Sequence, residues 1–251
     1  SVPLYKKVSK KIIELIGEGL AEGNVLPSEE TLSKMFGVSR STVREALSEL
    51  TSQGIITKKQ GIGNIVMDSA LKARYRIDLK LDFAGMLAEC GHTPRFVQSV
   101  SRYEHLVVDG IEDDYFVYDE LLYADDQIAA IFKIHIFKDR FESEPAPDMP
   151  KSNFFEFIFD FTSEVIAHSI VYFEAAVADS LMGDRFNIQE GTPVLSWKEV
   201  FYTIKDECVC YNRIYFNPRI FTPTMLRSSF DPEESPQNLI CEVSADLDQF
   251  R

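Results

Sequence analysis

The first quarter of the chain carries apolar residues at helical spacing, followed by two short β-branched runs. Val43, Ala46, Leu47 and Leu50 fall at positions i, i+3, i+4 and i+7, which is one face of a helix that begins after Ser39. A similar stripe lies near the N-terminus, and a shorter helical segment lies between the two. The N-terminal stripe comprises Val8, Ile12, Leu15 and Ile16. We therefore predict three helices that turn their apolar faces to a common core.

Local signals mark the ends of these helices and predict a hairpin after them. Ser28, preceded by Pro27, and Ser39 are good N-cap residues, and Gly37 can end the middle helix because glycine adopts the left-handed conformation at low cost. The runs 55–59 and 62–67 are rich in β-branched residues and flank a glycine loop, which is typical of a β-hairpin. Three helices and a hairpin make a winged helix-turn-helix.

Polar residues on the outer face of the third helix suit DNA. Arginine side chains bind guanine edges and phosphates, and hydroxyl groups bind phosphates. The tip of the hairpin suits the flanking DNA backbone. A generic helical hairpin with surface arginines is the alternative interpretation of this pattern. The candidate DNA-binding residues are Ser28, Glu30, Arg40, Ser41, Thr42, Arg44, Lys59, Gln60 and Gly61.

Several sequence words of this region resemble the GntR family of bacterial transcription regulators. They are Leu26-Pro27-Ser28-Glu29, the run from Val38 to Leu47, and Gly61-Ile62-Gly63. The resemblance implies that Arg40 and Arg44 contact operator DNA and that Gly61 lets the wing approach the minor groove. The family usually has arginine where this chain has Glu30. A carboxylate can accept a hydrogen bond from cytosine but cannot bind a guanine edge or a phosphate, and the alternative is that it points away from the DNA. We therefore expect an operator sequence that differs from the usual one of the family.

The rest of the chain is strand-rich and predicts an antiparallel α+β domain. Its phenylalanine-rich helix is expected to pack in the core rather than bind a cofactor. The predicted strands are 96–108, 115–123, 128–137, 165–178, 194–204 and 207–217, and the predicted helices are 81–90, 153–161 and 178–186. The predicted domains are a DNA-binding head over 1–67, a linker over 68–80, a body over 81–230 and an acidic C-terminal tail over 231–251.

The body is similar to the UTRA effector domain of the HutC subfamily. The similarity rests on Leu81-Asp82-Phe83, on Gly91 followed by Thr93-Pro94, and on Glu190-Gly191-Thr192-Pro193-Val194-Leu195. It also rests on Tyr123-Ala124-Asp125-Asp126 and on Ala178-Asp179. The resemblance implies a chorismate-lyase-like fold that senses a small metabolite. The expected fold class is therefore α+β, with an N-terminal winged helix-turn-helix followed by an antiparallel α+β UTRA domain.

The resemblance also implies an altered effector pocket. Many subfamily members hold sugar phosphates through two arginines, where this chain has Glu120 and Leu122, and through two glutamates, where it has Phe132 and Val209. We expect a small apolar or aromatic effector and no sugar phosphate, since an unsatisfied buried hydroxyl costs ~1–3 kcal/mol. A closed core that binds nothing is the alternative. The candidate effector-binding residues are Phe83, Ala84, Gly85, Glu120, Leu122, Phe132, Val209 and Tyr215, of which Phe83, Ala84 and Gly85 begin a helix that can hold a carboxylate.

Charge divides the chain in the same way. The net charge is −14, yet residues 1–66 hold nine Lys or Arg and seven Asp or Glu. An acidic body repels DNA, and a weakly basic head needs a partner to bind a specific site. We expect a cytoplasmic homodimer that binds double-stranded operator DNA, acts as a repressor and has no membrane association.

Enzyme motifs are missing from the sequence. It contains no metalloprotease, nucleophile-elbow, P-loop or dinucleotide-binding pattern, and its four histidines are scattered. Cys208-x-Cys210 lacks zinc-finger spacing, so buried free thiols are favoured over a metal site. We expect no cofactor, no metal and no catalysis. A lyase or hydrolase that uses the pocket of the body is the alternative function.

Overall fold

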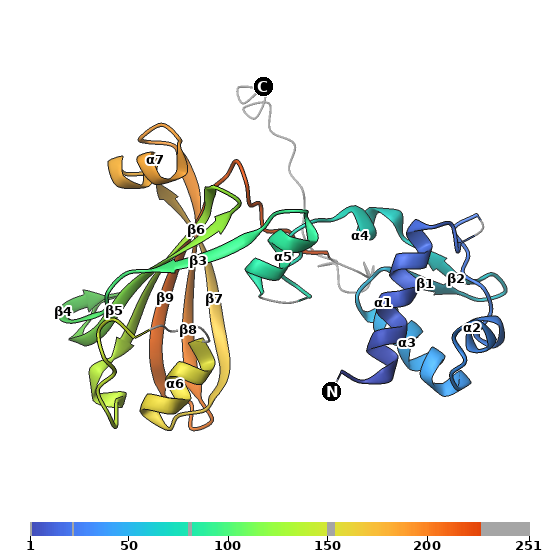
Figure 1. Ribbon diagram of the computed structural model, residues 1–251, viewed down its shortest axis with the longest axis horizontal. Helices are drawn as coiled ribbons and strands as arrows, with labels where there is room; N and C mark the ends of the chain where they lie inside the picture. Colours follow the sequence, from blue (N-terminus) through green and yellow to red (C-terminus); the bar gives the residue numbers. More distant parts are fainter. Residues whose placement is uncertain (1, 22, 80–81, 150–153, 227–251) are drawn as a thin grey trace, which may run out of the picture. The chain divides into compact units, whose positions relative to one another are not determined.

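The computed structural model describes residues 2–21, 23–79, 82–149 and 154–226, which form two compact units (Figure 1). The head runs through Lys72, and the body spans Ala73–Thr224. The predicted acidic tail at 231–251 lies outside the described residues. No helix in the described ranges is long and apolar enough to cross a membrane.

The head consists of three helices, a hairpin and a short fourth helix. These elements are α1 Leu4–Gly17, α2 Glu29–Phe36, α3 Arg40–Ser52, β1 Ile56–Lys59, β2 Gly63–Val66 and α4 Asp68–Lys72. The predicted stripes form its core: Ile12, Val43, Ala46 and Leu50 are fully buried. The helix α4 begins inside the segment that we predicted as a linker.

The predicted helix ends are present as hydrogen bonds. The Ser28 hydroxyl accepts from the Thr31 amide at 3.2 Å, and the Ser39 hydroxyl accepts from the Thr42 amide at 3.1 Å. Gly37 ends α2 in the left-handed conformation, with φ of 63°. These caps satisfy amides at the start of α2 and α3 and fix the turn between the two helices.

In its described residues, the body is a seven-stranded antiparallel sheet with three helices. Its strands are β3 Pro94–Gln98, β4 Arg102–Val108, β5 Ile111–Ala124, β6 Gln127–Phe137, β7 Ile166–Val177, β8 Pro193–Thr203 and β9 Cys208–Phe216. They follow the order β3-β5-β6-β9-β8-β7, and β4 pairs with the other half of β5. The helices are α5 Phe83–Glu89, α6 Phe154–Thr162 and α7 Ser180–Phe186, and a 3-10 turn covers Lys138–Arg140.

One predicted strand is wrong. The segment 96–108 forms two strands, because residues 99–101 leave the ladder and bond elsewhere. The Ser99 hydroxyl accepts from the Asp119 amide at 2.9 Å, and the Ser101 amide and hydroxyl both donate to the Pro147 carbonyl. The strands β3 and β4 therefore pair with successive parts of the long strand β5.

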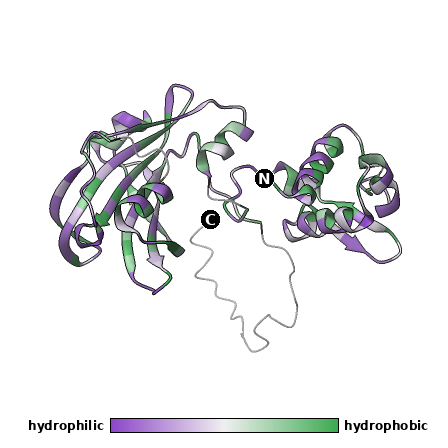
Figure 2. Ribbon diagram, turned by 60° about the horizontal axis from the view of Figure 1, so that its bottom comes forward, coloured by the Kyte–Doolittle hydropathy of each residue, from purple (hydrophilic) through white to green (hydrophobic). Residues whose placement is uncertain are grey.

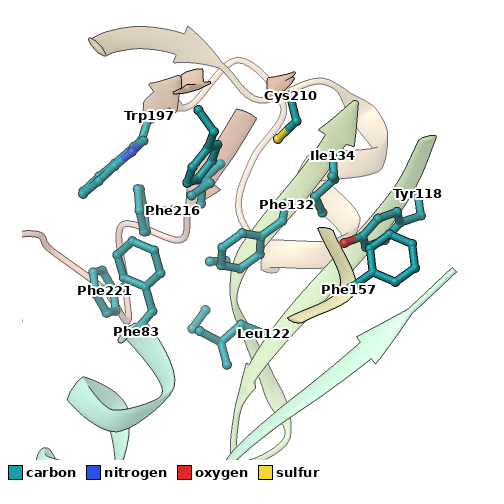
Figure 3. Packing of buried hydrophobic residues seen from close by; sticks show 14 of the residues in the cluster. Phe83, Tyr118, Leu122, Phe132, Ile134, Phe157, Trp197, Cys210, Phe216 and Phe221 are labelled. Carbon is teal, nitrogen blue, oxygen red and sulfur yellow. The ribbon is translucent and has the colours of Figure 1, made fainter. Parts of the chain in front are cut away.

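The sheet has an aromatic face and a second face with smaller clusters. Hydrophilic and hydrophobic residues alternate along its strands (Figure 2), as expected where the two faces differ. Phe83 of α5 packs edge-on against Trp197, Phe216 and Phe221, with ring centroids 5.4 to 5.6 Å apart (Figure 3). The helices α5 and α6 contribute to this aromatic cluster, whereas α7 packs into a separate cluster.

Candidate DNA-binding surface and effector pocket

The outer face of α3 carries the predicted DNA-binding side chains. Arg40, Ser41 and Arg44 are exposed, while Val43 and Leu47 of the same helix are buried. The Ser39 hydroxyl lies 2.7 Å from the Ser41 hydroxyl and 2.8 Å from that of Thr42. The start of α3 therefore presents two guanidinium groups beside a cluster of hydroxyls, which suits a phosphate backbone and guanine edges.

Arg44 is tied to the neighbouring helix, which the sequence did not indicate. Its Nη2 and Nε donate to Glu29 Oε2 at 3.0 and 3.3 Å. This hydrogen bond from Arg44 holds the pKa of Glu29 below its ordinary value, and the charges of Lys58 and Arg40 act in the same direction. Glu29 thus lies among three cations and orients one of them. No local pattern could have revealed a pair that is separated by 15 positions in the chain.

The other predicted DNA-binding residues, on α2 and in the wing, are also exposed. Glu30 forms an exposed ion pair with Lys34, with Oε1 and Nζ 2.8 Å apart. Lys59, Gln60 and Gly61 are all exposed in the wing loop, where Gly61 has φ of 79°. Ile62 beside them is 50% exposed and offers an apolar contact at the tip. The exposed side chain of Ser28 also accepts the cap bond at the start of α2.

A shallow hollow separates α3 from the wing. Its walls include Arg44 and Ser48 of α3, Lys58 of β1, Asn64 of β2 and Glu29 of α2. Of the predicted DNA-binding residues, Arg44 lines this hollow, which lies between the recognition helix and the strands of the wing.

The body contains a pocket of about 210 Å³ on the aromatic face of the sheet. It is lined by Asp82, Phe83, Phe96, Tyr118, Glu120, Phe132, Ile134, Phe154, Phe155, Glu199, Phe201, Asn212 and Ile214. Seven strands and helices contribute to these walls, and none of the described lining residues carries a positive charge. An apolar cavity with a few inward polar groups is the usual form of a small-molecule site.

The structure brings together three of the predicted effector residues. Phe83, Glu120 and Phe132 line the pocket. Glu120 Oε2 accepts from Gln98 Nε2 at 2.7 Å across the β3–β5 pair. Burial, followed by the nearby charge of Glu120, raises the pKa of the Tyr118 hydroxyl well above its ordinary value. The Glu120 end of the pocket is therefore polar and negatively charged.

The other predicted effector residues do not line this pocket. Leu122 and Val209 are fully buried in the aromatic cluster. Tyr215 packs into the cluster of α7, because it is one position out of phase with Ile214 and so points to the other face. The Asp82 carboxylate accepts from the Gly85 amide at 2.8 Å and already caps the helix end at Phe83, Ala84 and Gly85.

Sequence reasoning missed two polar residues of the pocket. Glu199 and Asn212 are direct partners across β8 and β9, and they are only 5% and 7% exposed. Glu199 stands between Trp197 and Phe201 on one face of its strand. A charged residue at the centre of an apolar stripe of period two was the available signal. Among the described residues, no group of histidine, cysteine or acidic side chains could hold a metal ion.

Two known domains match the chain. Residues 4–66 match "Bacterial regulatory proteins, gntR family", and residues 111–222 match the UTRA domain. The transcriptional regulator GgaR of Escherichia coli is 38% identical over 76 residues, which cover 29% of this chain and 31% of GgaR. The histidine utilization repressor of Klebsiella aerogenes is 40% identical over 67 residues, which cover 26% of this chain and 28% of that protein. The chain thus spans less than a third of these relatives.

Longer similarities reach into the body. The transcriptional repressor NagR of Bacillus subtilis is 26% identical over 213 residues, covering 80% of this chain and 85% of NagR. The crystal structure of the possible regulator YydK of Bacillus subtilis covers 91% of this chain and all of its own, with a TM-score of 0.65 and 18% identity. These relatives are transcriptional regulators and not enzymes. With a GntR-type DNA-binding head before a UTRA domain, the chain belongs to the GntR family of bacterial transcription regulators, in its HutC-like branch.

Proposed function

We propose that this chain is a ligand-responsive repressor that binds operator DNA as a homodimer. The main support for this proposal is the outer face of α3. The first turns of this helix carry Arg40, Ser41, Thr42 and Arg44, and the wing loop of the head is exposed as well. This surface would bind the operator, and the pocket of the body would bind the effector. Binding to bacterial operator DNA would take place in the cytoplasm.

Within the body, a chain of contacting aromatic rings connects the pocket to the segment around Tyr75. Phe83 lines the pocket and meets Phe221 at 5.6 Å between ring centroids, and Phe221 meets Tyr75 at 4.4 Å. The Thr224 amide donates to the Tyr75 carbonyl at 3.0 Å. A ligand that moves Phe83 would thereby reach the segment that leads toward the head. Such a ligand alters DNA affinity only if it binds one arrangement of the heads better than another.

The strand β7 is the surface that we assign to the homodimer. It is the last strand of the described sheet, and Ile170, Tyr172, Phe173 and Val177 are 42 to 66% exposed. Natural edge strands usually carry lysine, proline or a bulge that prevents pairing. The strand β7 contains no Lys, Arg or Pro over its 12 residues, and the one irregularity in its pairing with β8 lies at its start, between Ile166 and His168. An apolar antiparallel edge can pair with the same edge of a second copy around a two-fold axis.

The effector is expected to be largely apolar and to lack a phosphate. Glu120 and Glu199 line the pocket, and a phosphate dianion beside either would be repelled. At an effective dielectric of about 20, two like charges ~4 Å apart oppose binding by roughly 4 kcal/mol. Calorimetric titration with hexosamine phosphates should give no binding heat and no change in operator affinity. Micromolar binding of such a compound would contradict this part of the proposal.

The experiment for the function as a whole is selection of bound DNA from a random pool by the full chain. We expect a two-fold symmetric motif with two half-sites, and a mobility shift on it with dimer stoichiometry. An enzyme of lyase or hydrolase type would instead turn over a member of a substrate panel and select no motif. Failure to select any motif at physiological salt would refute the proposal.

A further inference from the structure

Glu199 is a buried carboxylate in the wall of the pocket. It lies on β8 with 5% of its surface exposed, and its Oε1 accepts from the Ser169 hydroxyl of β7 at 2.6 Å. In the described part of the chain, no lysine, arginine or histidine forms an ion pair with it. Buried carboxylates are rare without a cationic partner, because leaving water penalises the charged form. The site therefore holds a negative group whose natural counter-charge is missing from the described protein.

The polar neighbours of Glu199 can donate hydrogen bonds to its carboxylate, but none of those among the described residues brings a positive charge. Burial raises the pKa of Glu199 above its ordinary value, while Ser169 and the indole of Trp197 favour its ionised form. The Trp197 Nε1 is buried yet makes no hydrogen bond of normal geometry. Burial also raises the pKa of the Cys210 thiol on β9, with Glu199 among the nearby charges. In this environment, an ionised Glu199 is destabilised when the pocket is empty and would be stabilised by a bound cation.

The register of the sheet gives the pocket two polar ends. Glu199 stands opposite Asn212, whose other cross-strand neighbour is Ile134 of β6. Glu120 lies on β5, and β9 and β6 lie between β8 and β5. Adjacent strands are ~4.8 Å apart, so roughly 14 Å of sheet separates the backbones that carry the two carboxylates. Glu199 with Asn212 and Glu120 therefore line different ends of the pocket.

The surfaces between these ends are aromatic and aliphatic. Phe132, Ile134 and Ile214 lie between the two carboxylates, and five further phenylalanines, of which Phe154 and Phe155 belong to α6, complete the walls. Aromatic faces attract organic cations, most strongly where water is excluded. The volume of about 210 Å³ corresponds to some seven water molecules at ~30 Å³ each, which suits a single ring with a short chain.

We infer that the effector is a small organic cation, an amine on an aromatic or alkyl skeleton, and that Glu199 binds its ammonium group. Asn212 supplies a second polar contact to the amine, and Glu120 with Gln98 receives a hydrogen-bond donor at the far end. This inference rests on the proposed function, because it takes the pocket to be the effector site. Beyond the proposed function, the inference specifies that the effector is positively charged and that Glu199 selects for this charge.

The test uses four probes built on one ring: 2-phenylethylamine, tyramine, 2-phenylethanol and phenylacetate. Each is titrated by calorimetry into the full-length wild type, Glu199→Gln and the control Glu190→Gln, which removes an exposed carboxylate outside the pocket. We expect the wild type and the control to bind the amines at least tenfold more tightly than the alcohol and to reject phenylacetate. Glu199→Gln should lose tenfold or more for the amines and bind the alcohol unchanged. Binding of both amines too weak to detect at millimolar concentration, or equal binding by Glu199→Gln, would overturn the inference.

A second variant separates charge from packing. Glu199→Asp keeps the carboxylate on a shorter side chain and should bind amines more tightly than Glu199→Gln. If Asp and Gln variants with wild-type melting curves lose binding equally, the role of Glu199 is structural and the inference fails. The operator assay is read separately. Amine binding that leaves operator affinity unchanged would contradict the proposed regulation, yet it would support Glu199 as the cation site.

Discussion

Arg44 on the recognition helix donates two hydrogen bonds to Glu29 on the preceding helix, with Nη2 and Nε 3.0 and 3.3 Å from the same carboxylate oxygen. The pair fixes the direction of an otherwise mobile side chain on an exposed surface. It also places a negative charge where DNA phosphates would approach. The fixed orientation of Arg44 should raise DNA affinity, whereas the negative charge of Glu29 should lower it. Both effects should increase the preference for the correct DNA sequence.

Replacing Glu29 by glutamine is therefore expected to raise affinity for random DNA and to lower the preference for the selected operator. The charge that repels phosphates is removed, and Arg44 loses its fixed orientation. Anisotropy titrations on operator and scrambled duplexes at several salt concentrations measure both effects. Glu18→Gln, which removes an exposed carboxylate next to α1, is the control. A ratio of the two affinities equal to that of the wild type would mean that Glu29 does not orient Arg44 for DNA.

Glu30→Arg is expected to change the selected motif. In the wild type, Glu30 is exposed at the start of α2 and pairs with Lys34 at 2.8 Å. An arginine there would free Lys34 and bring a group that binds guanine and phosphate. Selection from the same random pool with both proteins makes the comparison. Identical motifs would show that position 30 has no part in sequence choice.

Ile170→Lys is expected to convert the homodimer into a monomer. The new ammonium group would lie on the exposed edge strand β7, where a second copy would have to bury it. Light scattering at micromolar concentration reads the mass directly. Ile204→Lys adds the same charge at an 82% exposed turn position outside β7 and should leave the mass unchanged. Dimers of the Ile170→Lys variant that are as stable as the wild type would exclude β7 as the interface.

The contribution of Glu199 to the stability of the ligand-free protein should fall as pH rises above about 4.5. Its pKa is raised from the ordinary 4.5 by burial, so the folded state binds this proton more tightly than the unfolded chain does. The resulting stabilisation is complete below pH 4.5 and is lost as pH passes through the higher folded pKa. Ser169, Trp197, Asn212 and Cys210 supply the polar groups around it.

Urea unfolding of the wild type and of Glu199→Gln between pH 4.5 and 7.5 isolates this effect. Each pKa unit of the shift corresponds to about 1.4 kcal/mol in the free energy of unfolding. The wild type should lose stability relative to the glutamine variant across this range. If the free energies of unfolding of the two proteins change with pH in parallel, Glu199 binds its proton equally tightly in the folded and the unfolded state.

The head could be predicted in detail because its signals are local. Ser28, Gly37 and Ser39 act within a few residues of themselves, and the stripe from Val43 to Leu50 has only one way to bury its apolar side. The break after β3 could not be predicted, since Ser99 and Ser101 bond to residues 20 and 46 positions away. Contacts of that kind depend on the fold and leave no trace in the local pattern.

The pocket illustrates the same limit. Alternation correctly sets Glu120 and Leu122 on one face of β5, but only three-dimensional packing decides that Leu122 is closed off while Glu120 lines the cavity. A one-residue difference of phase sends Tyr215 to the other side of the sheet. Glu199 and Asn212 meet only through the register of β8 and β9.

Operator binding by Arg40→Ala and Arg44→Ala tests the central claim most directly. Both side chains are exposed on α3, so their removal should leave the melting curve unchanged. At physiological salt, each variant should lose about ten- to hundredfold in affinity for the selected operator, as a lost contact to a base edge predicts. The control Arg102→Ala removes an exposed arginine of the body and should bind as the wild type does. Wild-type affinity of both Arg40→Ala and Arg44→Ala would contradict DNA recognition through α3.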